Sequence, residues 1–79
     1  MKVYAVTWYN HDEYETGILK ITKDYEEAKS ILDKETQKFK DEFGFSNSDI
    51  IIEETYRNLL GEEDCPLVEL FIEQKELEV

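Results

Sequence analysis

The chain has 79 residues, which is enough for one domain spanning residues 1–79 and too short for two. Its 20 Asp and Glu residues against 9 Lys and Arg residues give a net charge of -11, which argues against direct binding to nucleic acid because phosphates would be repelled. A hydrophobic fraction of 41%, with 13% aromatic residues, allows a small core and argues against a wholly disordered chain.

The sequence favours a cytoplasmic protein without a membrane anchor. No apolar run approaches the roughly 18 residues that a membrane-spanning helix requires. The N-terminal sequence MKVYAVTWY lacks the apolar block of a signal peptide. The single cysteine, Cys65, excludes an internal disulfide and is typical of a reducing compartment.

The N-terminal part of the chain predicts a β-hairpin. Lys2–Tyr9 is rich in Val, Tyr, Thr and Trp, which favour strands. One face of this strand would present Val3, Ala5 and Thr7, and the other Tyr4, Val6 and Trp8. Because both faces are fairly apolar, we expect a central strand or a strand with one face used for contact. A polar loop, Asn10–Glu15, leads to a second strand, Thr16–Thr22, in which Gly17 marks a bulge or a close backbone approach.

An amphipathic helix is predicted after the hairpin. Thr22 or Asp24 would cap it, and acidic residues occupy its first turn, where the helix dipole favours them. Apolar residues then recur at three- and four-residue steps, namely Tyr25, Ala28, Ile31, Leu32, Phe39 and Phe43. Glu35 interrupts this stripe, and Gly44 suits the left-handed conformation that ends many helices.

The segment 49–60 admits two interpretations. The isoleucine run Ile50–Ile52 favours a strand, because β-branched residues pack well in sheets. Ser48 could instead cap a helix that stops at Gly61. We prefer the strand, although Glu54 breaks its alternation.

The last element is predicted as a strand over Leu67–Gln74, after the turn sequence GEEDCP. Val68, Leu70 and Ile72 would face one way, and Glu69, Phe71 and Glu73 the other. The order strand, strand, helix, strand, strand predicts an α+β fold, an antiparallel sheet with one helix packed on one face. Tyr25, Ile31, Leu32, Phe39 and Phe43 would pack on that sheet.

No residue pattern indicates an enzyme, a cofactor or a metal site. His11 lies in a polar loop, which does not hold a nucleophile or an orienting acid beside it. The acidic turn around Cys65 disfavours a reactive thiolate. The zinc-ligand pairs, the calcium-loop spacing and the glycine-rich phosphate loop are all missing.

The negative charge increases along the chain. Residues 1–23 hold three acids and three bases, residues 24–49 hold eight and four, and residues 50–79 hold nine and two, which gives net charges of 0, -4 and -7. This charge either keeps a small protein in solution or forms an electronegative face for a basic partner.

The second possibility predicts a nucleic-acid mimic. Carboxylates on one strand face, such as Glu69 and Glu73, would lie about 13 Å apart and would imitate phosphates toward a basic nucleic-acid-binding groove. Phe71 would add an apolar anchor between them. The residues predicted to bind the partner are Glu53, Glu54, Glu62, Glu63, Asp64, Glu69, Phe71, Glu73 and Glu76.

The alternative is a small homo-oligomeric or regulatory protein-binding module. It would act through the face of its sheet, with Trp8, Tyr9 and Phe71 as apolar contacts. A core of this size gives limited stability, and a homodimer formed through the sheet would add buried area.

The segments MKVYAVTWYN and TKDYEEAKSIL carry a resemblance. An opening MK-V-Y strand, a hairpin and a YEEAK helix resemble small uncharacterised acidic proteins of bacteria and their phages. The resemblance covers less than half of the chain and implies a phage or mobile-element context. In that context it implies an inhibitor of a host defence nuclease, such as an anti-CRISPR protein or an inhibitor of a restriction enzyme.

Overall fold

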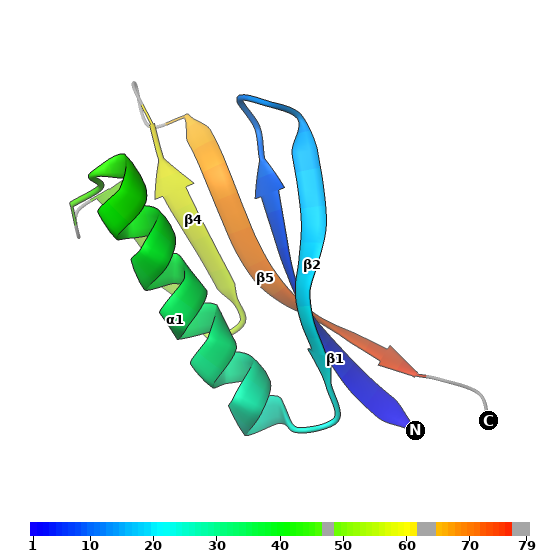
Figure 1. Cartoon of the computed structure of the whole chain (residues 1–79). Helices are drawn as coiled ribbons and strands as arrows, with labels where there is room; N and C mark the ends of the chain where they lie inside the picture. Colours follow the sequence, from blue (N-terminus) through cyan, green and yellow to red (C-terminus); the bar gives the residue numbers. More distant parts are fainter. Residues whose placement is uncertain (47–48, 62–64, 77–79) are drawn as a thin grey trace.

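The computed structural model describes residues 1–46, 49–61 and 65–76, and it contains an antiparallel sheet with a helix on one face (Figure 1). The elements in chain order are β1 (Lys2–Asn10), β2 (Glu15–Thr22), α1 (Tyr25–Phe43), β3 (Ile50–Glu53), β4 (Tyr56–Leu60) and β5 (Pro66–Glu76). Across the five-stranded sheet the order is β2-β1-β5-β4-β3, and all neighbouring strands are antiparallel. The predicted α+β fold is therefore confirmed.

The structure adds one strand to the predicted order. The segment 50–60 forms β3 and β4, which pair with each other from Ile50 opposite Leu59 to Glu53 opposite Tyr56. The preference for a strand over a helix is thus confirmed in the described part of this segment, while Ser48 lies outside the described residues. The alternation breaks at Glu54 because the chain reverses direction there, and a reversed strand restarts its alternation.

Helix α1 begins and ends as its sequence predicts. The side chain of Asp24 accepts a hydrogen bond of 2.9 Å from the backbone N–H of Glu26, which satisfies a donor of the first turn. Gly44 adopts the left-handed conformation with φ of 75°, and its N–H bonds the carbonyl of Lys40. Phe43 does not pack on the sheet as expected: it is 49% exposed, because its ring stacks on Phe39 instead.

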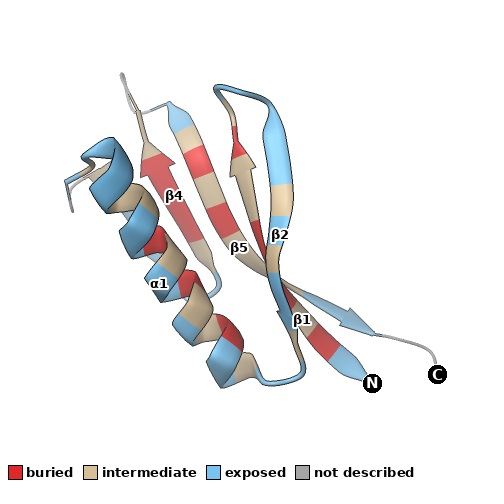
Figure 2. Cartoon of the chain, viewed as in Figure 1, coloured by how far each residue is buried: buried red, intermediate tan, exposed pale blue. Residues whose placement is uncertain are grey.

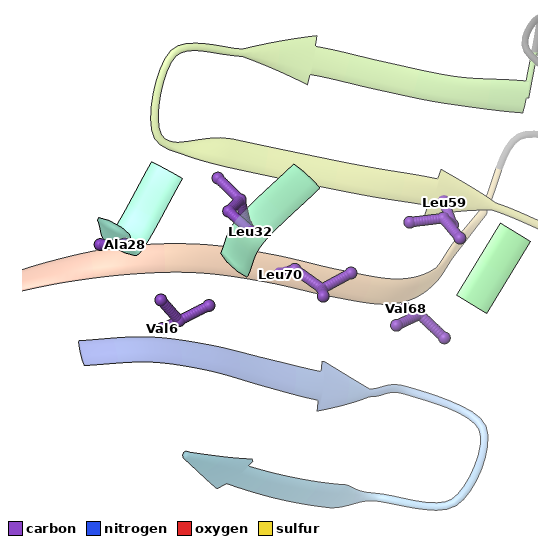
Figure 3. Packing of buried hydrophobic residues seen from close by; sticks show 6 residues of the cluster. All are labelled: Val6, Ala28, Leu32, Leu59, Val68 and Leu70. Carbon is purple, nitrogen blue, oxygen red and sulfur yellow. The ribbon is translucent and has the colours of Figure 1, made fainter. Parts of the chain in front are cut away.

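The core lies between α1 and the centre of the sheet. Its fully buried residues come from β1, β4, β5 and α1, and they are Val6, Ala28, Leu32, Leu59, Val68 and Leu70 (Figure 3). Figure 2 shows buried residues on these elements and exposed ones along most of β2. The residues that pack on this core confirm the predicted alternation of the first and last strands, with Tyr4, Trp8 and Ile72 directed toward it.

A buried arginine connects α1 to the β3–β4 hairpin. The side chain of Arg57 is 6% exposed, and it donates to Asp33 Oδ1 of the helix at 2.8 Å. It also donates to the carbonyl oxygens of Glu53 and Tyr56 on either side of the hairpin turn. The guanidinium of Arg57 thus donates hydrogen bonds to three acceptors of the protein itself. The 210 Å³ cavity lined by Arg57 and Ile52 belongs to this contact between α1 and the β3–β4 hairpin.

The side chain of Trp8 lies over Gly17, where the sequence predicted a bulge or a close backbone approach. Gly17 pairs with Trp8, and a Cβ atom on Gly17 would lie 2.8 Å from Trp8 Nε1. The Trp8 ring in turn contacts Phe39 of α1, with ring centroids 6.2 Å apart. The register irregularity is adjacent, between the pairs that Val6 and Thr7 form with β2. The indole therefore needs the missing side chain at Gly17 to reach the helix.

We expect Gly17→Ala to destabilise the fold by about 1–3 kcal/mol, because the new methyl group displaces a ring that is packed on α1. Gly61→Ala is the matched control, since the nearest atom to its Cβ would be 3.5 Å away, and we expect a change within about 0.5 kcal/mol. Thermal unfolding followed by circular dichroism measures both. Equal melting temperatures for the two variants would contradict the tight packing at Gly17.

Candidate functional site

One face of the sheet has no cover in the described ranges. Helix α1 packs on the face that contains Val6, Leu59 and Leu70. The residues between these point to the opposite side, because successive side chains of a strand alternate. We call this second surface the open face.

The strand registers place the residues of the open face in rows. Cross-strand partners share a face, so each row can be followed from β2 to β3. The central row is Ile18, Thr7, Phe71, Tyr56 and Glu53; one neighbouring row is Thr16, Tyr9, Glu69, Asn58 and Ile51; the other contains Ile21, Ala5 and Glu73. The rows are uncharged on β2 and β1, and their carboxylates lie on β5 and β3.

On the β2–β1 side of the open face, two large aliphatic side chains of β2 are exposed. Ile18 is 60% exposed and Ile21 is 56% exposed, although both are large aliphatic residues. Ala5 and Thr7 on β1 are buried without a helix above them. Larger side chains on β2 and β5 flank these two small residues, and this explains their burial. Ile18 and Ile21 lie in adjacent rows of β2, so the exposed aliphatic surface of this side is concentrated on that strand.

The residues predicted to bind a partner separate into two groups. Glu53, Glu69, Phe71 and Glu73 lie on the open face, in β3 and β5. Glu54 lies in the β3–β4 turn beside α1, where it accepts a hydrogen bond of 3.2 Å from the Tyr25 hydroxyl. Glu76, at the end of β5, is 3.5 Å from the N-terminal ammonium of Met1. Glu62, Glu63 and Asp64 lie outside the described residues.

Two of the open-face carboxylates have partners within the chain. Glu73 Oε2 lies 3.6 Å from Lys75 Nζ, on the same strand face. Glu69 Oε2 lies 3.1 Å from His11 Nε2, and Glu69 Oε1 accepts a hydrogen bond from the Tyr56 hydroxyl. These contacts reduce the negative potential that the open face presents to a partner.

The contacts around Glu69 are a feature that the sequence analysis missed. His11 follows β1 directly, and its backbone N–H donates a hydrogen bond of 2.8 Å to the carbonyl of Leu67. Its ring packs against the ring of Tyr9, with ring centroids 4.6 Å apart. It is therefore fixed beside β5, whereas the sequence predicted a plain loop residue. The available signal was the even spacing from Tyr9 to His11, which places both on one side of an extended chain.

The electrostatics of this cluster differ from those of an acid–base catalyst. Burial, the hydrogen bond to Glu69 and the charges of Glu69 and Glu53 raise the pKa of Tyr56 to about 12. Burial alone would raise the pKa of Glu69, but the contacts with Tyr56 and His11 outweigh burial and lower it. General acids and bases work best with a pKa near the working pH, and both shifts lead away from neutrality.

No family model matches this chain, and no curated protein and no solved structure is significantly similar to it. The part of the chain that the structure describes contains no helix that combines the length and the apolar composition needed to cross a membrane. Within the same residues, no group of three or more His, Cys, Asp or Glu side chains is arranged to hold a metal ion.

We expect Glu69→Gln to make stability less dependent on pH. The pKa of Glu69 is lowered by folding, so its carboxylate stabilises the fold above the unfolded-state pKa, and this contribution is lost as the pH falls through the folded-state pKa. The variant should lose about 1.5–3 kcal/mol at neutral pH, the usual contribution of a hydrogen bond to a charged group, and little once the carboxylate is protonated. Urea denaturation across acidic and neutral pH measures this difference.

Glu73→Gln is the control for this experiment. The Glu73–Lys75 pair is exposed, with 42% and 59% of the two side chains accessible, and such pairs contribute well under about 1 kcal/mol. If Glu69→Gln and Glu73→Gln give the same stability profile against pH, the Glu69 contacts do not stabilise the fold.

Proposed function

We propose that this protein is a non-enzymatic, cytoplasmic protein-binding module that acts through the open face of its sheet. The observation that supports this best is the pair of exposed isoleucines Ile18 and Ile21 in adjacent rows of β2, on a face without a cover in the described ranges. Contiguous exposed apolar surface of this kind marks protein interfaces more often than scattered apolar residues do.

The energetics favour association through the apolar side of this face. Burying one exposed Ile or Phe side chain fully stabilises a complex by about 1.5–3 kcal/mol. Ile18 and Ile21 are each more than half exposed and lie in adjacent rows of the same strand, so one partner surface can cover both. No charged side chain stands between them on the open face, so their burial does not require the desolvation of a charge.

We expect Ile18→Glu to abolish binding through the open face and Ile52→Glu to leave it intact. Ile52 is the matched control because it is also exposed, at 67%, but its pairing with Arg57 places it on the face that α1 covers. Each chain is immobilised through the single, exposed Cys65, and capture from host lysate and of purified second copies is compared. A ligand that both variants retain equally, or the absence of any ligand for the unmodified chain, would refute the proposed function.

A second candidate function uses the acidic side of the same face. Glu53, Glu69 and Glu73 lie there together, so this side could occupy the basic nucleic-acid-binding site of a partner such as a host defence nuclease. The exposure of Glu53 and the net charge of -11 support this candidate. The partners of Glu69 and Glu73 within the chain make it the weaker of the two.

For this second candidate, we expect affinity for the nuclease to fall as the salt concentration rises. Glu53→Lys and Glu73→Lys should each weaken binding by about fivefold or more, equal to about 1 kcal/mol for one charge pair. Glu42→Lys, a charge reversal at an exposed position of α1, is the control. Affinity that is the same at low and high salt, measured by calorimetry with purified nuclease, would exclude electrostatic mimicry.

A further inference from the structure

We infer that the cavity between α1 and the β3–β4 hairpin binds a small organic monocarboxylate, with its carboxylate on Arg57 and its apolar part on Ile50 and Ile52. The cavity lies on the helix side of the sheet, so this inference does not depend on the proposed function of the open face. Three observations support it: unused donors on a buried guanidinium, the charge of the cavity lining, and the size of the cavity with its aliphatic wall.

The guanidinium of Arg57 is buried and has more donors than the fold uses. Its side chain is 6% exposed, and a guanidinium has five N–H groups. At most three of them are used, two on Nη1 for the carbonyls of Glu53 and Tyr56 and one on Nη2 for Asp33. The others, on Nε and Nη2, have no acceptor among the described residues. Because buried donors are nearly always paired, they indicate an acceptor that enters the cavity.

The position of these donors suits a carboxylate. Nε and Nη2 share one edge of the planar guanidinium, and a carboxylate accepts two parallel hydrogen bonds from such an edge. Asp33 does not provide both bonds, because only its Oδ1 accepts from Arg57, and its side chain is 64% exposed. Thr36 and Gln37, which also line the cavity, form hydrogen bonds within α1. The guanidinium edge is therefore available to a carboxylate from outside the chain.

The charges of the lining favour a ligand with a single negative charge. The lining residues include two cations, Lys40 and Arg57, and one carboxylate, Asp33, so their net charge is +1 although the whole chain has a net charge of -11. A monoanion brings this lining to neutrality. A cation would be repelled, and a dianion would leave one negative charge unpaired beside the buried guanidinium.

The size and the aliphatic wall of the cavity limit the rest of the ligand. A cavity of about 150 Å³ holds one benzene molecule, so a volume of 210 Å³ accommodates a six-membered ring with a short acidic group. Ile50 and Ile52 form the β3 side of the lining, and Ile52 is 67% exposed although it lies on the face toward α1. A ring would cover part of this aliphatic surface. We expect a dissociation constant on the order of 1 mM, because so small a ligand makes few contacts.

The first test uses benzoate as the probe and benzamide, its uncharged counterpart, as the ligand control. We expect benzoate to shift the Nε–H resonance of Arg57 and the backbone amides of β3 in ¹H–¹⁵N NMR spectra. Benzamide should bind about tenfold more weakly, because a hydrogen bond to a charged group is stronger than one to a neutral group. Equal affinities for the two compounds, or no shift at about ten times the expected dissociation constant, overturn the inference.

The second test uses two pairs of variants with the same net charge within each pair. Lys40→Gln removes a cation of the lining, and Lys38→Gln removes an exposed cation of α1 outside the lining. We expect Lys40→Gln to bind benzoate about two- to fivefold more weakly than Lys38→Gln does. Asp33→Asn should bind it about two- to fivefold more tightly than Glu42→Gln, because the ligand then shares the guanidinium with no other carboxylate. Equal affinities within both pairs overturn the inference.

Thermal unfolding at matched ionic strength separates a binding site from a purely structural contact. Asp33→Asn leaves the buried Arg57 without its anion, so we expect a lower melting temperature. Benzoate should then raise the melting temperature of this variant by more than it raises that of the unmodified chain, and benzamide should not. A melting temperature that benzoate leaves unchanged in both chains overturns the inference. Lys40 is not buried, so the lysine pair tests the site even where Asp33→Asn does not fold.

Discussion

The structure depends on the fact that one helix cannot cover both faces of a sheet. Helix α1 has 19 residues, which makes it about 28 Å long and about 10 Å wide, and it lies across one face only. The sheet, however, contains apolar residues on both faces of β1, with Val6 toward the helix and Ala5 away from it. The described part of the chain thus has apolar residues on both faces of the sheet but a helix over one face only. The proposed interface follows from this imbalance.

Several of the charged side chains are engaged in contacts within the chain, so the net charge alone does not describe the surface. Glu69 is fixed by His11 and Tyr56, so this carboxylate contributes to a tertiary contact as well as to the surface. Arg57, one of the two basic residues after position 49, is buried and bound to Asp33. On the open face the carboxylates therefore lie on β5 and β3, while the β2–β1 side is uncharged. Because the charge of the open face changes from one side to the other, a partner can bind it in few orientations.

Local patterns predicted most of the fold. The alternation in β1 and β5 and the caps of α1 at Asp24 and Gly44 were all visible in the sequence, because they depend on neighbours within a few positions. The division of 50–60 into two strands was not predicted, since three isoleucines followed by two polar residues fit one strand or a tight hairpin equally well. Sequence spacing also could not show Glu69 beside His11, because that contact depends on the pairing of β1 with β5.

The small core gives association a further consequence. Six fully buried apolar residues form its centre, and a domain of this size is only marginally stable by itself. A partner that binds the folded state and not the unfolded chain adds stability in proportion to the logarithm of its concentration. For an open face that binds a partner protein, the concentration of that partner then controls how much of the chain is folded. The exposed isoleucines of β2 would thus contribute to stability only in the associated state, which explains how a fold can retain them outside its core.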